Sequence, residues 1–448
     1  MPYKGLSALA LAGALALATV FPARADDTGG SLFLDQEFID AAKAYTRPLR
    51  PALAPHTAVH FVLVSDPTIN AFTTAENVIF VNSGLVQATT AAAQLQGVLA
   101  HELGHVAAHH IFQSYQSGKA AAIGALAGMA VGIGTALAGA PQAGQAIAMG
   151  SQAGAIQSML AHTRTQEEEA DRHAVNALHA AGYSAQGMVD MFNTLRTQSQ
   201  LSYDAPPPWL VTHPLPPERL ANLRQILAGE KPGLKNLGDT TPVNYERLKA
   251  KVFALTHTSG ATLRTYPGTT EVARYAQALA AMQRGDSQTA TALLQPLLAA
   301  HPKDAYYQEL MGQIALNHGD LAQAHAIFAK LVAQEPAALL FHYELAQTLQ
   351  AQAQYAAAAT QYEWINQTWP EWSEPWQGLG ICYGNLGRIA ESHLAMAESH
   401  WAAGDTKATK DSLTLARHYI KQLKKGSAEA TRASQWAETL QNRITAAQ

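Results

Sequence analysis

The apolar positions in the first hundred residues follow a strand pattern. His60 to Val64 is a β-rich run, and the turn-forming pair Asp66-Pro67 ends it. Two further short runs follow, Ile69 to Thr74 and Val78 to Asn82, separated by Ala75-Glu76-Asn77. Three short runs joined by tight connections predict a small antiparallel sheet. Residues 27 to 55, before the first run, are typical of helix until prolines interrupt them.

The next segment, from Thr89 to Tyr115, follows the helical period instead. Its apolar residues recur three or four positions apart and form one stripe: Leu95, Leu99, Leu103 and Val106. His101 and His105 lie off that stripe. We therefore expect a helix whose apolar face is packed and whose histidine face is free.

From about residue 271 onward, small residues and prolines recur every 34 positions. Four series share this spacing: Pro302, Pro336 and Pro370; Gly285, Gly319, Ala353 and Gly387; Ala278, Gly312, Ala346 and Gly380; and Ala290, Ala324, Ala358 and Ser392. Small residues let two helices touch, and the proline ends the second helix, as in a tetratricopeptide helix pair. Stacked pairs form a groove that binds extended segments or partner proteins, or they serve as a structural spacer.

Loop-forming residues between these regions predict the domain boundaries. Gly229 to Pro242 is rich in Gly, Pro and Asn, and we place the end of a first domain, residues 26–230, there. A linker, residues 231–270, is expected to hold a short helix, Tyr245 to Leu255, and a loop, Thr256 to Thr270. The repeats then occupy residues 271–441, and their last helices are divergent because Gly404-Asp405 breaks the 34-residue spacing.

Residues 120–161 carry no charge and are dominated by Ala and Gly. Ala120 to Ala140 is long enough to span a bilayer, but Ala and Gly are weakly apolar and five glycines interrupt the run. We expect a tightly packed or membrane-apposed helical hairpin, with peripheral membrane contact through residues 120–160. A true span, and with it an integral membrane protein, is the alternative.

The beginning of the chain has the composition of a secretory signal peptide. Lys4 precedes an apolar run, Leu6 to Phe21, and Ala23-Arg24-Ala25 is a cleavage signal, so residues 1–25 are expected to be removed. Cys382 is the only cysteine, which excludes an intrachain disulfide. The formal net charge is −4, and no basic stretch suggests a nucleic-acid surface, so we expect no nucleic-acid partner.

The stretch with the strongest chemical signal is His101-Glu102-Leu103-Gly104-His105. Residues four apart share one helix face, so His101 and His105 can reach one metal ion. A zinc ion with an open position lowers the pKa of a bound water to about 7. Glu102 can then take the proton as that water attacks a peptide carbonyl. The motif predicts a zinc endopeptidase with one Zn²⁺ per chain.

Two histidines leave a third metal ligand to be found. The best candidate segment is Thr163 to Asp171, in which Glu167 and Asp171 lie four apart on one helix face. One carboxylate could bind the metal while Asp171 orients a ligating histidine. Glu168 and Glu169 are typical of a solvated helix start. Periodicity alone does not say which glutamate is the ligand.

The two motifs together resemble the HtpX and CAAX-prenyl-protease type of zinc metallopeptidase. The resemblance rests on H-E-L-G-H followed by E-x-x-A-D, on the segments Asn70 to Phe72 and Ile79 to Leu85, and on Thr212 to Pro216. It implies a gluzincin-type α+β domain, a small sheet with active-site helices, in which Glu167 is the third zinc ligand. With the repeats, the chain is expected to be mainly α, ending in an α-solenoid. The family often has Arg where this chain has His109, and a Gly pair where it has Glu76-Asn77.

Further residues have expected roles. By the same resemblance, His213 is either a fourth zinc ligand that holds the enzyme latent or an ordinary loop histidine. Arg219 would neutralise the carboxylates or the developing oxyanion. Backbone pairing of an extended substrate is expected along one strand: Val78, Ile79, Phe80, Val81 and Asn82. His109, His110, His162 and His173 are more typical of surface or packing positions.

Our interpretation of the sequence is a periplasmic zinc endopeptidase. Resemblance to secreted, repeat-bearing members of the family implies quality control of outer-membrane β-barrel proteins. Unfolded or misassembled proteins of that class would be clients, and the β-barrel assembly machinery a partner of the repeats. Two alternatives remain: a chaperone or adaptor with a latent metal site, and an integral membrane metalloprotease.

Overall fold

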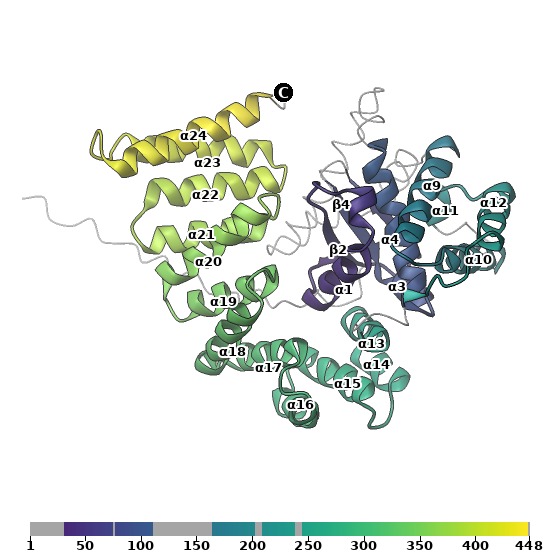
Figure 1. Cartoon of the computed structure of the whole chain (residues 1–448). Helices are drawn as coiled ribbons and strands as arrows, with labels where there is room; N and C mark the ends of the chain where they lie inside the picture. Colours follow the sequence, from purple (N-terminus) through teal and green to yellow (C-terminus); the bar gives the residue numbers. More distant parts are fainter. Residues whose placement is uncertain (1–30, 75–76, 111–163, 202–207, 238–243, 447–448) are drawn as a thin grey trace, which may run out of the picture.

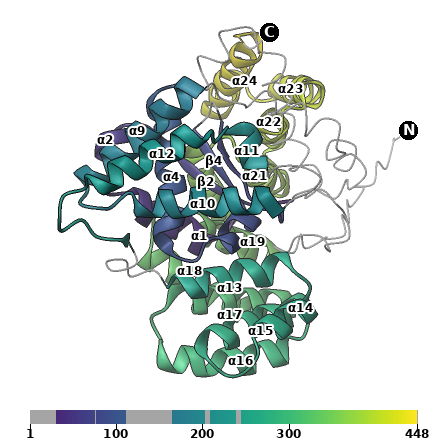
Figure 2. The same cartoon turned by 90° about the vertical axis from the view of Figure 1, so that its right-hand side faces the viewer.

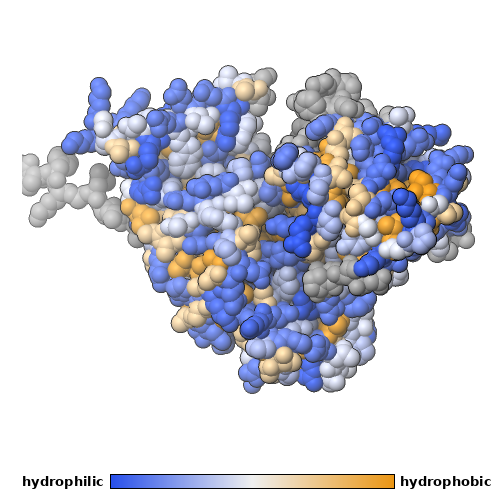
Figure 3. Space-filling model, in the orientation of Figure 1, coloured by the Kyte–Doolittle hydropathy of each residue, from blue (hydrophilic) through white to orange (hydrophobic). Residues whose placement is uncertain are grey.

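The computed structural model describes residues 31–74, 77–110, 164–201, 208–237 and 244–446 (Figure 1). The predicted signal peptide, residues 1–25, and the predicted hairpin of residues 120–161 lie outside the described residues. Hydrophilic residues dominate the face shown in Figure 3. Within the described ranges, no helix combines the length and the apolar composition that crossing a membrane requires.

A four-stranded sheet lies at the centre of the first domain. Its strands are β1 (Ser31–Phe33), β2 (His60–Ser65), β3 (Ala71–Thr73) and β4 (Val78–Asn82), in the spatial order β1-β2-β4-β3. The expected all-antiparallel sheet is wrong, because β2 and β4 run parallel. β3 and β4 form a hairpin, and its second strand inserts beside β2 and therefore runs in the direction of β2. The short strand β1 had no signal in the sequence.

This strand order changes the expected substrate strand. β4 pairs with β2 on one side and with β3 on the other, so both of its backbone edges are occupied. The segment Val78–Asn82 therefore has no edge left for a substrate strand, contrary to our expectation. β3 lies at the edge of the sheet instead.

Helices cover one face of the sheet and build the site. They are α1 (Gln36–Thr46), α2 (Arg50–Leu53), α3 (Ser83–Ala88), α4 (Ala92–Ala107), α9 (Arg164–Ala180), α10 (Gln186–Leu201), α11 (Pro208–Thr212) and α12 (Pro217–Ala228). The predicted apolar stripe of α4, Leu95 to Val106, is buried in the core. α4 is shorter than expected, since His109 has a positive φ of 54° just after its end.

α4 is also buried on its histidine face, because α9 packs closely against it. A Cβ on Gly104 would lie 2.6 Å from the backbone oxygen of Ala170 on α9, so only glycine permits this approach. The expectation of a free ligand face is wrong: His101 and His105 are both fully buried. The close approach brings the histidines of α4 to the carboxylates of α9.

The remaining helices follow one another in a curved row (Figures 1 and 2). They are α13 (Tyr245–Thr256), α14 (Ser259–Thr265), α15 (Glu271–Gln283), α16 (Ser287–Ala300), α17 (Ala305–His318), α18 (Leu321–Gln334), α19 (Leu339–Ala351), α20 (Tyr355–Thr368), α21 (Ser373–Asn385), α22 (Ile389–Ala402), α23 (Thr406–Ile420) and α24 (Ala428–Ala446). From α15 to α22 the helix pairs recur every 34 residues, as the sequence indicates. The loop expected between Thr256 and Thr270 instead contains the short helix α14.

The repeat helices pack against the first domain through apolar and charged contacts. Val62, Val64, Val78 and Phe80, on the face of the sheet opposite the helices of the first domain, share a hydrophobic cluster with residues of α17 to α22, and His60 stacks on Trp369. A second contact is a set of ionisable side chains, all buried except the partly exposed Asp304, that we call the junction cluster: Asp35, Glu37, Arg247, Lys251, Asp304 and Glu309. It joins the start of α1, α13 and α17. α13 therefore ties the two regions together.

Candidate metal centre

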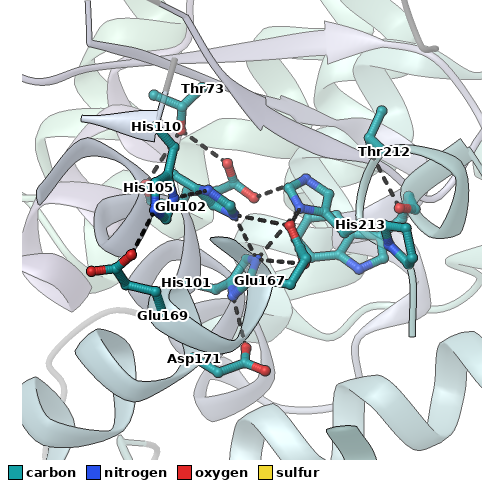
Figure 4. A network of polar contacts seen from close by, with 12 residues as sticks. Thr73, His101, Glu102, His105, His110, Glu167, Glu169, Asp171, Thr212 and His213 are labelled. Atoms are coloured by element: carbon teal, nitrogen blue, oxygen red, sulfur yellow. Dashed lines mark hydrogen bonds and ion pairs between the residues drawn. The ribbon is translucent and has the colours of Figure 1, made fainter. Parts of the chain in front are cut away.

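Four side chains from three separate parts of the chain converge beneath the sheet (Figure 4). His101 and His105 come from α4, Glu167 from α9, and His213 from the segment after α11. Each offers one ligand atom, and these atoms lie within 4.8 Å of one another. All four residues are at most 1% exposed. Among the described residues this is the one group that could hold a metal ion.

The separations between these atoms fit a tetrahedral metal ion. His101 Nε2 lies 3.0 Å from His105 Nε2 and 3.4 Å from His213 Nδ1. The carboxylate of Glu167 lies 3.5 Å, 3.3 Å and 3.0 Å from the same three nitrogens. An ion that binds nitrogen or oxygen ligands at 2.0–2.1 Å in a tetrahedron separates them by roughly 3.3 Å. The site is therefore built for a cation of this geometry.

Hydrogen-bond partners behind the two histidines of α4 orient their rings toward this centre. His101 Nδ1 lies 2.9 Å from Asp171 Oδ1, so it donates there and leaves Nε2 facing the other ligands. His105 Nδ1 lies 2.9 Å from His110 Nδ1, whose other ring nitrogen lies 3.3 Å from Glu169. His110 is 1% exposed and contacts the His105 ring directly, so it does more than the surface or packing role that the sequence indicates.

Arg219, at the start of α12, neutralises the carboxylates of the site. Its Nε and Nη2 donate to both oxygens of Asp171 at 2.5 Å and 2.8 Å, and its Nη1 donates to Glu167 at 2.5 Å. Of the two expected roles, these contacts match carboxylate neutralisation. Burial acts to raise the pKa of Asp171, but Arg219 and His101 hold it below its usual value.

The same groups shift the other ligand pKa values. Burial opposes ionisation of Glu167, but the neighbouring His213, His101 and His105 hold its pKa well below its usual value. Burial acts to lower the pKa of His101, but the hydrogen bonds of Asp171 and Glu167 outweigh it and raise that pKa to about 9. The carboxylates are thus ionised at neutral pH, and a metal ion that binds here displaces the proton of His101.

The carboxylate of Glu102 lies beside this cluster, and one of its two oxygens accepts a hydrogen bond. Thr73 Oγ1, on β3, donates to Glu102 Oε2 at 2.9 Å. Glu102 Oε1 is buried and accepts no hydrogen bond within the residues that the structure describes. It lies 3.6 Å from His213 Nε2, on the side of the ligand cluster. A buried carboxylate oxygen left in this way is poised to accept a proton from a molecule in the site.

The residues singled out in the sequence come together, apart from the β4 segment. His101, Glu102, His105, Glu167, Asp171, His213 and Arg219 form one network, while Glu168 is exposed as expected. The sequence did not indicate the contact of Thr73 with Glu102, and it gave His110 only a surface or packing role. No motif marks Thr73, because its partner lies 29 residues away. The position of His110, five residues after His105, was the available signal for that residue.

Comparison with known proteins supports this reading of the site. Residues 36–227 match the model of Peptidase family M48. A Beta-barrel assembly-enhancing protease of Escherichia coli is 31% identical over 282 residues, which are 60% of this chain and 56% of that protein. The Yersinia pestis protein of the same name is 29% identical over 352 residues, 77% and 71% of the two chains. Metalloprotease YcaL of Escherichia coli is 30% identical over 186 residues, 39% and 65% of the two chains.

Proposed function

We propose that the protein is a zinc endopeptidase, because residues 36–227 match the model of Peptidase family M48. One observation carries the proposal: four buried donor atoms lie within 4.8 Å of one another, beside an oxygen of Glu102 that accepts no hydrogen bond among the described residues. Two or three imidazole nitrogens with one carboxylate form a donor set typical of zinc. The donor set therefore fits the metal that the motif predicts.

In this proposal His101, His105 and Glu167 hold the ion, and Asp171 and Arg219 fix the ligands in place. A bound Zn²⁺ supplies Lewis acidity, which activates a water molecule and polarises the peptide carbonyl. Glu102 Oε1 takes a proton from the water as its oxygen attacks the carbonyl carbon. Glu102 then gives that proton to the amide nitrogen, and the carbon–nitrogen bond breaks. Thr73 Oγ1 donates its hydrogen bond to the other Glu102 oxygen, Oε2, throughout.

His213 is proposed as a latch that keeps the enzyme latent. Its Nδ1 completes the tetrahedron, and a catalytic zinc site needs that position open. Its ring also stacks on Trp209 with 4.1 Å between ring centroids, and its backbone N–H bonds to the Trp209 carbonyl. The segment after α11 therefore has to move before a substrate carbonyl can enter.

The strand order moves the proposed substrate strand from β4 to β3. β3 is the edge strand, and α4 packs against it, so a peptide paired to β3 would run past the ligand cluster. Edge pairing reads the backbone of an extended chain and needs little side-chain specificity. Such a mode suits unfolded or misassembled strand-forming clients.

The cellular role is proposed from the relatives and the predicted signal peptide. Two of the relatives are called Beta-barrel assembly-enhancing protease, and the chain spans about half the length of the first of them. We infer a periplasmic enzyme whose clients are stalled outer-membrane β-barrel proteins, with the repeats recognising clients or the β-barrel assembly machinery. A second candidate, a chaperone or adaptor with a latent metal site, is favoured only by the closed position of His213.

Changing Glu102 to Gln tests the enzymatic proposal. We expect casein cleavage by the purified mature chain to fall at least about 10²-fold, because the general base is lost. Zinc content should stay at that of the unchanged protein, since Glu102 is not among the proposed ligands. Glu168→Gln, the same change at an exposed position on α9, is the matched control. Cleavage that persists in the Glu102→Gln protein would contradict the role of Glu102 as the general base.

A further inference from the structure

Two side chains contact the Glu102 carboxylate: Thr73, which donates a hydrogen bond to Oε2, and His213, whose Nε2 lies 3.6 Å from Oε1. The terminal torsion of a glutamate side chain is broad, so packing alone fixes the direction of its two oxygens poorly. In the described part of the chain, Thr73 Oγ1 donates the one hydrogen bond that this carboxylate receives. Thr73 is 3% exposed and Glu102 is fully buried, so water does not replace that bond.

The position of Thr73 follows from the strand period of β3. Successive side chains alternate between faces, so Ala71 and Thr73 point toward α4 and are buried. Phe72 points the other way and stacks on Phe80 at 5.0 Å between ring centroids. The backbone of Thr73 is paired with Ile79 of β4, which fixes where the hydroxyl lies.

We propose that Thr73 is a positioning residue: by holding Glu102 Oε2, it turns Oε1 toward the ligand cluster and couples the edge strand to the general base. This inference rests on the proposed endopeptidase function. Figure 4 shows the Thr73 hydroxyl and the ligand cluster on opposite sides of the Glu102 carboxylate. A peptide paired along β3 would contact the strand that carries Thr73, so its binding steadies the orientation that proton transfer needs.

The test compares threonine-to-valine changes at two adjacent positions. Thr73→Val keeps the shape of the side chain but removes the donor, whereas Thr74→Val removes a buried hydroxyl that has no hydrogen-bond partner among the described residues. With a fluorogenic peptide substrate, we expect Thr73→Val to lower kcat about 10- to 100-fold with KM unchanged, the effect of losing a hydrogen bond to a charged group. Thr74→Val should keep the original kcat, and Thr73→Ser should restore most of it.

Three further measurements separate positioning from folding. Zinc content should be the same in all variants, and thermal unfolding should show that each is folded. In a Glu102→Gln background, Thr73→Val should cause no additional loss of kcat, because the two residues act as one unit. If Thr73→Val fails to fold, Thr73→Ala removes the same donor without adding a methyl group.

The outcomes are distinct for the two ideas. A folded Thr73→Val or Thr73→Ala protein with kcat within twofold of the original overturns the positioning role, provided that cleavage still depends on Glu102. A further loss of kcat in the Glu102→Gln background also overturns it. If the unchanged protein shows no Glu102-dependent cleavage, the proposed function fails, and the inference fails with it.

Discussion

Two buried charge networks, the metal centre and the junction cluster, differ in where their positive charge comes from. In the junction cluster the cations belong to the chain. Lys251 Nζ lies 2.7 Å from Asp35 and 3.2 Å from Glu309, and Arg247 bonds to Glu37 at 2.6 Å. Each cation sits on α13 between carboxylates of the first domain and of the repeats. This network is closed and joins two parts of the molecule.

The metal centre also contains a cationic side chain, Arg219, but its guanidinium does not fill the space between the metal-ligand atoms. Arg219 is taken up by Asp171 and by one oxygen of Glu167. The donor atoms of His101, His105 and Glu167 face one another at 3.0–3.5 Å. In the junction cluster, buried carboxylates pair with a lysine and an arginine of the chain and connect two parts of the molecule. In the metal centre, buried carboxylate and imidazole atoms converge and can hold a metal ion.

The largest effect should come from removing the cation of the junction. Lys251→Met leaves Asp35 and Glu37 buried without that partner, and we expect the free energy of unfolding to fall by about 3 to 5 kcal/mol. Urea denaturation measures the change. Lys43→Met, at an exposed position on α1, is the control and should have little effect. Zinc content of the folded fraction should not change; a loss of zinc would mean that the two networks are not independent.

An intermediate effect should come from opening the metal centre. His213→Ala removes the proposed latch and leaves three ligands. We expect basal casein cleavage to rise at least about tenfold, because an open state that is a minor population becomes the only one. His56→Ala, an exposed histidine of the same domain, is the control. An unchanged cleavage rate would show that His213 is a packing residue and not a latch.

Most residues of the metal centre could be predicted from the sequence, whereas few residues of the junction cluster could. His101, Glu102 and His105 lie within five residues, and Glu167 and Asp171 lie one helical turn apart, so local spacing carries their chemistry. The 34-residue recurrence also survives into the structure, because each repeat pairs mainly with its neighbours.

The parts that the sequence did not reveal depend on contacts between distant segments. Arg247 and Lys251 appear as ordinary charges of a short helix, yet their partners lie more than 200 residues before them or more than 50 after them. The position of β4 between two strands depends on a crossover that the strand pattern does not encode. Thr73 reaches Glu102 only because that crossover places β3 beside α4.

The smallest effect should be a change in how stability depends on pH. Burial raises the pKa of Glu309 from its ordinary value of 4.5 to about 8, against the lowering effect of Lys251. Between these values the folded protein holds a proton that the unfolded chain releases. The contribution of Glu309 to stability is therefore fully present below about pH 4.5 and is lost as pH rises toward 8. Glu309→Gln should flatten this slope, measured by urea denaturation between pH 5.5 and 7.5.

The sign of that slope separates Glu309 from the carboxylates of the metal centre, because those carboxylates respond in the opposite direction. Asp171 and Glu167 have lowered pKa values, so their contribution to stability is present at neutral pH and is lost as pH falls through those values. Glu309→Gln should leave this acid limb unchanged, and some alkaline slope should persist because burial also raises the pKa of Glu344. Glu371→Gln, exposed in the repeats, is the control. A slope between pH 5.5 and 7.5 that is the same in both variants would show that Glu309 is ionised in the folded protein, and that the junction is held by charge alone.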